Sequence, residues 1–311
     1  MQDGGTAGVI GPDVIVSTLY GPMVVRGPTN TITGYVMGYA VGTQSCSVGD
    51  DPVLWQQLPS VQHPVIRSSM FRLRGNRFEQ IGTSWVKHGF YATNDPNCGL
   101  ICTAPGNHGG ALLYPGCSDP YSASLNATQS GLGPASQINA FTGAFSSNVV
   151  HPSNGGNGIG GLIQVHNVDV DPSLNGDARY YVEGHYVTAD DAAAGNANNN
   201  ASYQRATIVS APTFPEDSCS GTDPQKFCVT LTDFTHDTLA RIRAWKDNDP
   251  SVVETDAQVP GVGLFILSAR VSALNDGFWH YEYALHNLNS DRSGKSFTIP
   301  IAIGASVINV G

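Results

Sequence analysis

Short runs of β-branched and aromatic residues, broken every few positions by glycine or proline, constrain the fold of this chain more than any other feature. The chain carries 36 glycines and 19 prolines among 311 residues, which favours many turns and short elements. Residues 9–43 show the pattern, and residues 263–287 repeat it on both sides of the turn former Asn275-Asp276-Gly277. The sequence therefore predicts a mainly β fold.

A glycine-rich run at residues 153–161 is the best candidate for a boundary inside the chain. We expect a β-rich half at 1–152 with long disulfide-tied loops, and a second half at 162–311 in which strand-like alternation is clearer. Each half fits a β-sandwich or jelly roll. The two halves either pack against each other or form one domain.

One helix stands out against this strand-like background. Residues 237–248 place Leu239, Ile242 and Trp245 on one helical stripe, and Asp237 can cap the first turn. We therefore expect one short helix near 237–248.

The charge balance is acidic, with a formal net charge of -10 and only 13% charged residues. The acidic residues are scattered through loops, so the chain lacks the basic surface that nonspecific nucleic-acid binding or an anionic membrane requires. No apolar run is long enough to span a membrane. We expect no nucleic-acid partner and no membrane span. An extracellular polysaccharide or polymer, or a second copy of the chain, remains as a partner class.

The six cysteines form an even set, which fits disulfide bonds in an oxidising compartment. Composition alone leaves the pairing open, since six cysteines allow about 15 connectivities. Proximity along the chain gives the expected pairs, which are Cys219–Cys228, Cys98–Cys102 and, for the remaining two, Cys46–Cys117.

The two ends of the chain also bear on its location. The opening MQDGGTAG is polar and glycine-rich, so we interpret it as a mature secreted form with an added initiator methionine. The closing TIPIAIGASVINVG is an apolar, strand-like run without a polar tail. We therefore expect the natural chain to continue beyond Gly311.

Positive charge concentrates in residues 62–90, although the whole protein is acidic. Guanidinium groups pair with carboxylate or sulfate groups, and aromatic faces stack on sugar rings, so this stretch could bind an anionic polysaccharide or serve a lyase-like reaction. The alternative is a solvated edge strand whose arginines pair with nearby acids. The candidate anion-binding or glycan-binding residues are Arg67, Arg72, Arg74, Arg77, Lys87 and Trp85.

Strand alternation argues against one catalytic cluster in that stretch. Arg72 and Arg74 should face away from Phe71 and Leu73, and His88 should lie in an apolar row. We therefore expect an anion-facing edge beside a buried histidine.

A transition-metal site is the leading functional hypothesis. Glu183 with His185, and His280 with Glu282, are each spaced i, i+2 on a strand, which places both side chains of a pair on one face. If the two strands are neighbours, four ligands for zinc, copper or iron would meet. The alternative is half-buried histidines that bond to neighbouring carboxylates.

The second-choice metal site is the histidine pair His63 and His88, with Met70 as a soft extra ligand. A histidine before proline often marks a turn, and a histidine in an apolar row is usually a core residue. The structural interpretation is therefore the simpler one for both histidines.

A calcium-type loop is predicted at residues 169–177, where short spacing brings together oxygens of the kind that a hard cation prefers. The loop is not an EF-hand, because its sixth position lacks glycine and Tyr180 stands where the glutamate would be. The choice is between an irregular structural calcium loop and a polar turn. The candidate ligands are Asp169, Asp171, Asn175 and Asp177.

Several longer stretches resemble a group of large secreted bacterial proteins. They are QHPVI, FEQIGTSWVKHGF, GCSDPYSASLNATQSGLGP, VHNVDVDPSLNGDARYYVEGHYVTADDAAAGN and WHYEYALHNLNSDRS. The resemblance covers most of the chain. Because that group has no assigned activity, it implies secretion but no reaction, cofactor or site residue.

Three functional classes follow in order. The first is a secreted metal-binding protein, which could be a metalloenzyme acting on an environmental polymer. The second is a polysaccharide-binding or lyase-like protein that uses the arginine-rich strand at 67–77. The third is a structural cell-surface or filament-forming module without catalysis. Motifs for a serine nucleophile, a zinc protease or a phosphate loop are absent from the sequence.

Overall fold

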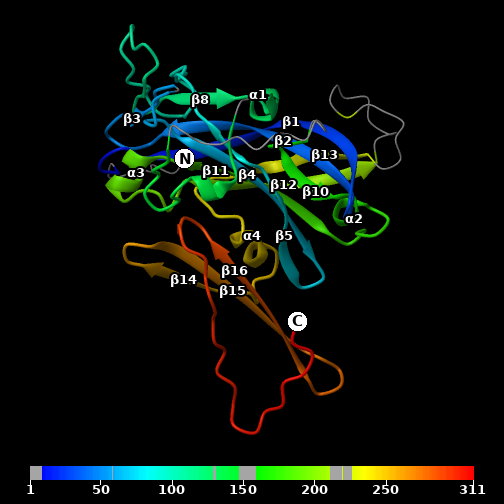
Figure 1. The fold of residues 1–311 in the computed structure, drawn as a ribbon. Helices are drawn as coiled ribbons and strands as arrows, with labels where there is room; N and C mark the ends of the chain where they lie inside the picture. The colour runs from blue at the N-terminus through cyan, green and yellow to red at the C-terminus, as the bar shows by residue number, and fades with distance from the viewer. Residues whose placement is uncertain (1–8, 58, 129–130, 147–158, 211–218, 220–225) are drawn as a thin grey trace.

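The computed structural model describes residues 9–311 except 58, 129–130, 147–158, 211–218 and 220–225. The described chain is mainly β, as predicted, with an 11-stranded, a 3-stranded and a 2-stranded sheet (Figure 1). The described helices are all short, and none has the length and apolar character needed to cross a membrane. They are α1 (Ala123–Thr128), α2 (Asn167–Val170), α3 (Ala189–Ala194), α4 (Arg243–Asn248) and the 3-10 helix η1 (Ala135–Gln137).

The 11-stranded sheet, called the main sheet below, forms the body of the molecule. Its antiparallel path runs β1-β2-β10-β5-β4-β11-β12-β13, with β6, β8 and β9 attached beside it. The strands on the path are β1 (Val14–Thr31), β2 (Gly34–Ser47), β10 (Ile163–His166), β5 (Arg77–Thr83), β4 (Val65–Arg74), β11 (Arg179–Val187), β12 (Ala201–Ser210) and β13 (Phe227–His236). The attached strands are β6 (Val86–His88), β8 (Ser118–Tyr121) and β9 (Gly131–Gly133).

The main sheet curls until its two ends meet. The backbone N–H of Leu19 in β1 donates to Thr235 Oγ1 in β13 at 2.9 Å, and Ser202 Oγ in β12 donates to the Val16 carbonyl at 2.5 Å. The curl encloses the largest apolar cluster, which includes the fully buried Met37 and Tyr39. The sheet is thus nearly closed, and its concave side is the main core.

Strands from both sides of the expected boundary at 153–161 lie next to each other in this one sheet. The short strand β10 pairs with β2 on one side, where Ile163 lies opposite Tyr39, and with β5 on the other, where Val165 lies opposite Gly82. Residues 153–158 lie outside the described residues. The segments 1–152 and 162–311 therefore share one sheet.

The convex side of the main sheet carries a second apolar layer. Because strand side chains alternate, β4 sends Met70 into the concave core and Phe71 to the convex side, where both are almost fully buried. Trp245 of α4 packs on this convex cluster. Both faces of β4 are therefore covered, and Ser68 and Ser69 are buried with their apolar neighbours.

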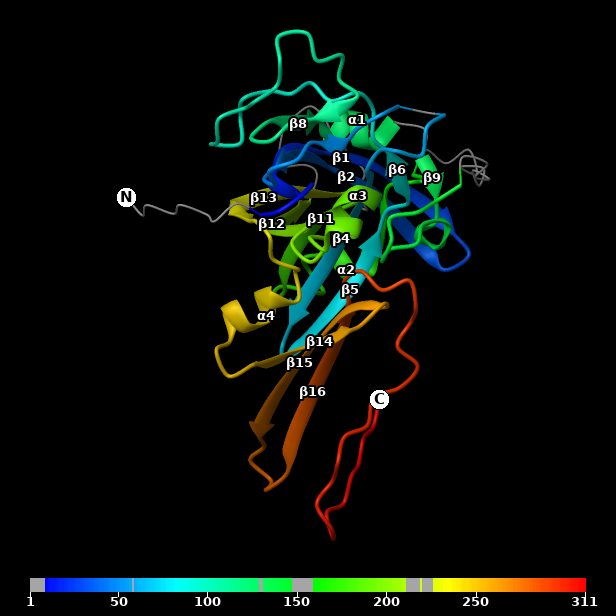
Figure 2. The ribbon, with the colours of Figure 1, turned by 90° about the vertical axis from the view of Figure 1, so that its left-hand side faces the viewer.

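The 3-stranded sheet, called the C-terminal sheet below, consists of β14 (Val253–Val259), β15 (Gly263–Ala273) and β16 (Trp279–Asn287). It lies below the main sheet in Figures 1 and 2, with α4 beside it. Leu264 and Ile266 of β15 pack against Ile242 and Ala240 from the segment before α4.

The predicted helix at 237–248 is present only in its second half, since α4 begins at Arg243. Thr238 has a φ of 59°, which an α-helix does not accommodate. The Thr238 N–H donates to Ser202 Oγ at 3.0 Å and the Arg241 N–H to Glu183 Oε2 at 2.9 Å. Residues 237–242 therefore use their backbone donors to bind the main sheet.

Three disulfide bonds connect all six cysteines, and one expected pairing is confirmed, Cys219–Cys228. The expected pairs Cys98–Cys102 and Cys46–Cys117 are wrong. Cys46 in β2 lies opposite Ser118, so alternation turns the preceding Cys117 to the other face. The observed bonds are Cys46–Cys98 and Cys102–Cys117. The loops they tie also form the 2-stranded sheet of β3 (Val53–Leu54) and β7 (Leu112–Leu113).

Candidate functional site

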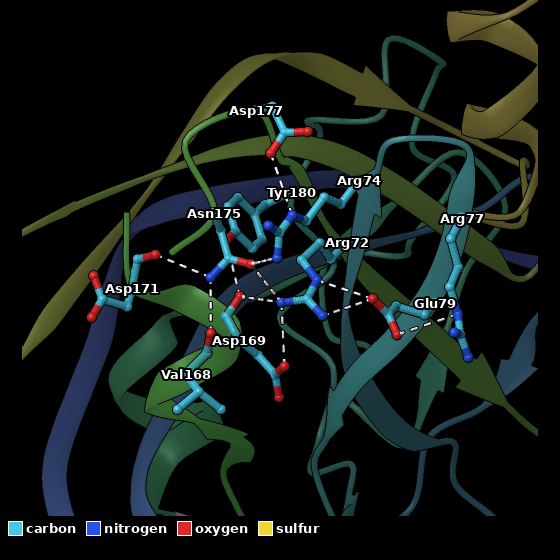
Figure 3. A network of polar contacts seen from close by, with 10 residues as sticks. All are labelled: Arg72, Arg74, Arg77, Glu79, Val168, Asp169, Asp171, Asn175, Asp177 and Tyr180. Carbon is cyan, nitrogen blue, oxygen red and sulfur yellow. Dashed lines mark hydrogen bonds and ion pairs between the residues drawn. The ribbon is translucent and has the colours of Figure 1, made fainter. Parts of the chain in front are cut away.

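The arginine-rich strand and the calcium-type loop meet and bind each other (Figure 3). Arg72 Nη1 donates to Asn175 Oδ1 at 2.7 Å and lies 3.2 Å from Asp169 Oδ1. The same guanidinium pairs with Glu79 at 2.7 Å. Arg74 adds an ion pair to Asp177 at 3.3 Å. The positive charge proposed for a polymer and the oxygens proposed for calcium therefore face one another.

This network gives the loop oxygens partners of their own. Asp171 Oδ1 accepts hydrogen bonds from the N–H and hydroxyl of Ser173, at 2.8 and 2.7 Å. The Asn175 amide donates to the Val168 and Asp171 carbonyls, at 2.8 and 3.0 Å, and so closes the turn. The Arg72 guanidinium supplies positive charge to the loop at Asn175 and Asp169. The contacts support the polar-turn alternative over a calcium loop.

Of the remaining candidate anion-binding residues, Arg77 shares Glu79 with Arg72, whereas Arg67 and Lys87 are engaged elsewhere. Arg77 is exposed and 3.9 Å from Glu79. Arg67 is half-buried, with its Nε donating to Thr83 Oγ1 at 2.8 Å. Lys87 is buried, whereas Trp85 is half-buried. A glycan could therefore reach only part of the predicted set.

Lys87 occupies an unusual position inside the protein. Its Nζ lies 3.8 Å from the centroid of the Tyr121 ring and has no hydrogen-bond partner among the described residues. Burial holds the pKa of this amine well below its ordinary value, against the opposing charge of Asp119. Burial also raises the pKa of Asp119 to about 6, although Thr93 and Trp55 donate hydrogen bonds to its carboxylate.

His63 and His88 come together as a buried pair, as the second-choice metal hypothesis requires. His63 Nε2 lies 2.6 Å from His88 Nδ1, and the ring of Phe145 packs on both imidazoles at 5.3 and 5.5 Å between centroids. Burial lowers the pKa of His63. The lowered pKa favours the uncharged form of His63, and the contact between the two rings gives both histidines a polar partner inside the protein.

The leading metal candidates are split between the two sheets. Glu183 and His185 lie on β11 of the main sheet, whereas His280 and Glu282 lie on β16 of the C-terminal sheet, so their strands are not neighbours. His280 Nε2 and Glu282 Oε1 form an exposed pair at 3.0 Å. Among the described residues, no three His, Cys, Asp or Glu side chains are grouped to hold a metal ion.

Glu183 belongs instead to a buried charged cluster between the sheets. Its Oε2 accepts from the backbone N–H of Arg241 and lies 3.4 Å from the Arg241 guanidinium, which in turn lies 3.3 Å from His286 Nδ1. Burial alone would raise the pKa of Glu183, but Arg241 and the nearby histidines bring it below the ordinary value. His185 and Arg67 complete the cluster electrostatically.

The two histidines of this cluster are held neutral. Burial lowers the pKa of His185 to about 4. Burial and the Arg241 charge lower that of His286 to about 3. Burial likewise lowers the pKa of Arg241 to about 9, although Glu183 opposes the shift. This cluster joins the C-terminal sheet to the main sheet, and Glu183 is the carboxylate that opposes the charges of both Arg241 and Arg67.

The two faces of the C-terminal sheet differ, since the inner face mixes apolar with charged and polar side chains and the outer face is apolar. His286 and Ala284 point to the main sheet, so alternation turns the odd-numbered residues of β16 outward. The rings of Tyr281 and Tyr283 stack at 6.4 Å on that outer side. The cross-strand partners of these residues extend the same face over β15 and β14. We define the outer face as Val253, Thr255, Ala257, Phe265, Leu267, Ala269, Val271, Trp279, Tyr281, Tyr283 and Leu285.

The outer face is apolar, uncharged and accessible. Trp279, Tyr281 and Leu285 are 62%, 54% and 44% exposed, and Val253 and Val271 are 66% and 42% exposed. Contiguous apolar patches of this kind mark interaction surfaces on soluble proteins. Sequence reasoning recognised the strands but missed this face, because alternation in WHYEYAL shows that the strand has two sides without showing which side is covered.

Comparison with known proteins adds no identity. No family model matches the sequence, and no curated protein matches it either. The resemblance to large secreted bacterial proteins therefore stays a prediction.

Proposed function

We propose that the protein is a structural module of an extracellular assembly and that it docks through the outer face of its C-terminal sheet. A single observation supports this proposal most strongly, namely that a one-layer sheet exposes a continuous apolar face. A sheet is stable when its apolar face is covered by another layer. The three disulfide bonds fit an oxidising environment, and we include secretion in the proposal on that ground.

The charged groups support the same function indirectly. Arg72 is engaged by Asn175 and Glu79, and Glu183 by Arg241. Such contacts stabilise the body of the protein and leave these groups little freedom to bind a substrate. A rigid body that carries an apolar sheet suits a scaffold or adhesive role better than catalysis.

The proposal requires that the outer face is accessible in the monomer. Trp279 reports on it through the difference between wild type and a Trp279 variant, because Trp55 and Trp245 are buried and the half-buried Trp85 is common to both proteins. Iodide quenching at submicromolar protein concentration should reduce the fluorescence of the wild type more than that of the Trp279→Phe variant. Quenching that is equal in the two proteins would mean that Trp279 is shielded in the monomer, and it would refute the docking function.

Metal binding is the second candidate function, and the facing nitrogens of His63 and His88 at 2.6 Å are the observation that favours it. Opening this contact would create two imidazole ligands for copper or zinc. Protein purified without an affinity tag should be incubated with copper, zinc or calcium, dialysed and analysed for metal. A stoichiometric metal that the His63→Ala variant loses would support this function, and substoichiometric metal in the wild type would reject it.

A further inference from the structure

The segment 296–303 is the clearest unused feature of the described chain. Its sequence SFTIPIAI alternates, with Phe297, Ile299, Ile301 and Ile303 on one side, which is the pattern of a strand that covers an apolar surface. No strand or helix is formed there, and every residue from 291 to 311 is exposed. The side chain of Ile303 is fully exposed and those of Phe297 and Ile301 about half exposed.

This segment already touches the outer face at one point. The ring of Phe297 lies 5.8 Å from that of Tyr283 between centroids. Beyond this contact the chain leaves β16 and extends past the sheet (Figures 1 and 2). The face and the segment therefore have matching chemistry, both uncharged and rich in aromatic and branched aliphatic side chains.

We infer that the partner of the outer face is a second copy of this chain, and that residues 296–303 of each copy lie on the outer face of the other. This inference rests on the proposed docking function and names its partner. Reciprocal exchange of identical segments closes a two-fold dimer without any new surface. Each copy contributes both an apolar alternating segment and an apolar face, so the pairing is self-complementary.

Pro300 determines how the segment binds. Proline has no backbone N–H and so interrupts a hydrogen-bonded ladder, which disfavours pairing of this segment along the edge of β14. A strand laid across the outer face as a second layer needs side-chain packing rather than a continuous ladder. We therefore place Ile299 and Ile301 against the face, with Ala302 directed away from it.

Two charge substitutions and two matched controls test the contact. Tyr281→Lys in the face and Ile301→Lys in the segment should each weaken self-association at least tenfold, measured by sedimentation equilibrium. His280→Lys, next in sequence but on the inner side of β16, and Ala302→Lys, on the far side of the segment, should leave it unchanged. Circular dichroism and the thermal midpoint check that each variant is folded.

Mixing the two defective variants separates exchange from other arrangements. In a mixture, the intact segment of Tyr281→Lys can bind the intact face of Ile301→Lys, so one of the two contacts is restored. The mixture should associate more tightly than either variant alone. If the mixture associates as weakly as each variant alone, the proposed exchange of segments between copies is refuted.

Isotope labelling tests whether the contact lies between copies. A photo-crosslinking residue at position 301 in unlabelled protein, mixed with nitrogen-15-labelled protein, should yield crosslinks from the unlabelled segment to labelled face peptides. Crosslinks confined to one label would show that the segment folds onto its own sheet, which would refute the inference. A wild type that is monomeric at about 100 μM, where a micromolar interface is saturated, would refute it as well. Trp279 accessible in such a monomer would leave the docking function standing with another partner, whereas a shielded Trp279 would reject both.

Discussion

Replacing Glu183 with glutamine should destabilise the protein far more than its conservative chemistry suggests. The Glu183 and Arg241 side chains are only 7% and 4% exposed. Removing one member of a buried ion pair leaves the other charge uncompensated, which typically costs about 3–5 kcal/mol. Glutamine keeps an oxygen for the Arg241 backbone N–H, so most of the loss should come from the stranded guanidinium. Folded domains are stable by about 5–15 kcal/mol, so this loss is easily measured.

Urea unfolding followed by circular dichroism measures the effect. The matched control is Asp256→Asn, which removes one of the two carboxylates that pair with Arg243, in an ion pair whose acid is 49% exposed. Pairs of that kind contribute about 1 kcal/mol or less. The double variant Glu183→Gln/Arg241→Met should recover part of the loss, because the guanidinium that lost its carboxylate is removed as well, whereas Arg67 still lacks the charge of Glu183.

The outcome decides whether the cluster stabilises the junction between the sheets. A loss for Glu183→Gln that equals the loss for Asp256→Asn would contradict the reasoning, since burial would then add nothing. Failure of the double variant to recover stability would do the same. A first unfolding step that exposes only the C-terminal sheet would locate the effect at the junction.

Three further outcomes follow from the same structure. The pKa of His286 is about 3 in the folded protein against an ordinary 6.5, so the unfolded chain binds the proton first and the stability should fall by at most about 5 kcal/mol as the pH drops from 6.5 to 3. The urea midpoint of the His286→Gln variant should fall less steeply with pH than that of the wild type. An equally steep fall in the two proteins would contradict the lowered pKa of His286. The Cys46→Ser/Cys98→Ser variant opens a loop with a sequence separation of 52, so its free energy of unfolding should fall by about 4 kcal/mol. The Cys219→Ser/Cys228→Ser variant opens a loop with a separation of 9 and should lose about 2.5 kcal/mol. The reverse order in urea unfolding would reject loop closure as the explanation. Lys87→Met should leave the stability at pH 7 equal or raise it, because an apolar chain of similar length replaces a buried amine with a lowered pKa. A free energy of unfolding lowered by more than about 2 kcal/mol in thermal unfolding would show that the contact with Tyr121 is strongly favourable.

Local features of the fold could be predicted from the sequence. The hairpin around Asn275-Asp276-Gly277 is present as β15 and β16, because turn chemistry and strand alternation are properties of adjacent residues. The Cys219–Cys228 bond joins residues 9 apart, so proximity was enough to identify it. The burial of His88 also followed from alternation.

Long-range pairing could not be predicted in the same way. The position of Cys117 depends on the register of β8 against β2, and a register is set by contacts that no local pattern encodes. The Arg72 network unites residues about a hundred positions apart. A loop rich in aspartate and a strand rich in arginine each suggest an external ligand until the fold shows that they bind each other. The first half of the predicted helix does not form, because the backbone N–H groups of Thr238 and Arg241 donate to side chains of the main sheet instead.

The insertion of β10 between β2 and β5 has a consequence for how the chain folds during synthesis. In the described part of the main sheet, the four residues Ile163–His166 pair with the hairpin of β1 and β2 on one side and with the hairpin of β4 and β5 on the other. Until these residues leave the ribosome, each hairpin has an unpaired edge that invites aggregation. The first two disulfide bonds lie wholly upstream, between residues 46 and 117, so oxidation can fix the early loops while the sheet is still open. Closure of the sheet then waits for contacts of high sequence separation, which makes it the slow step of folding.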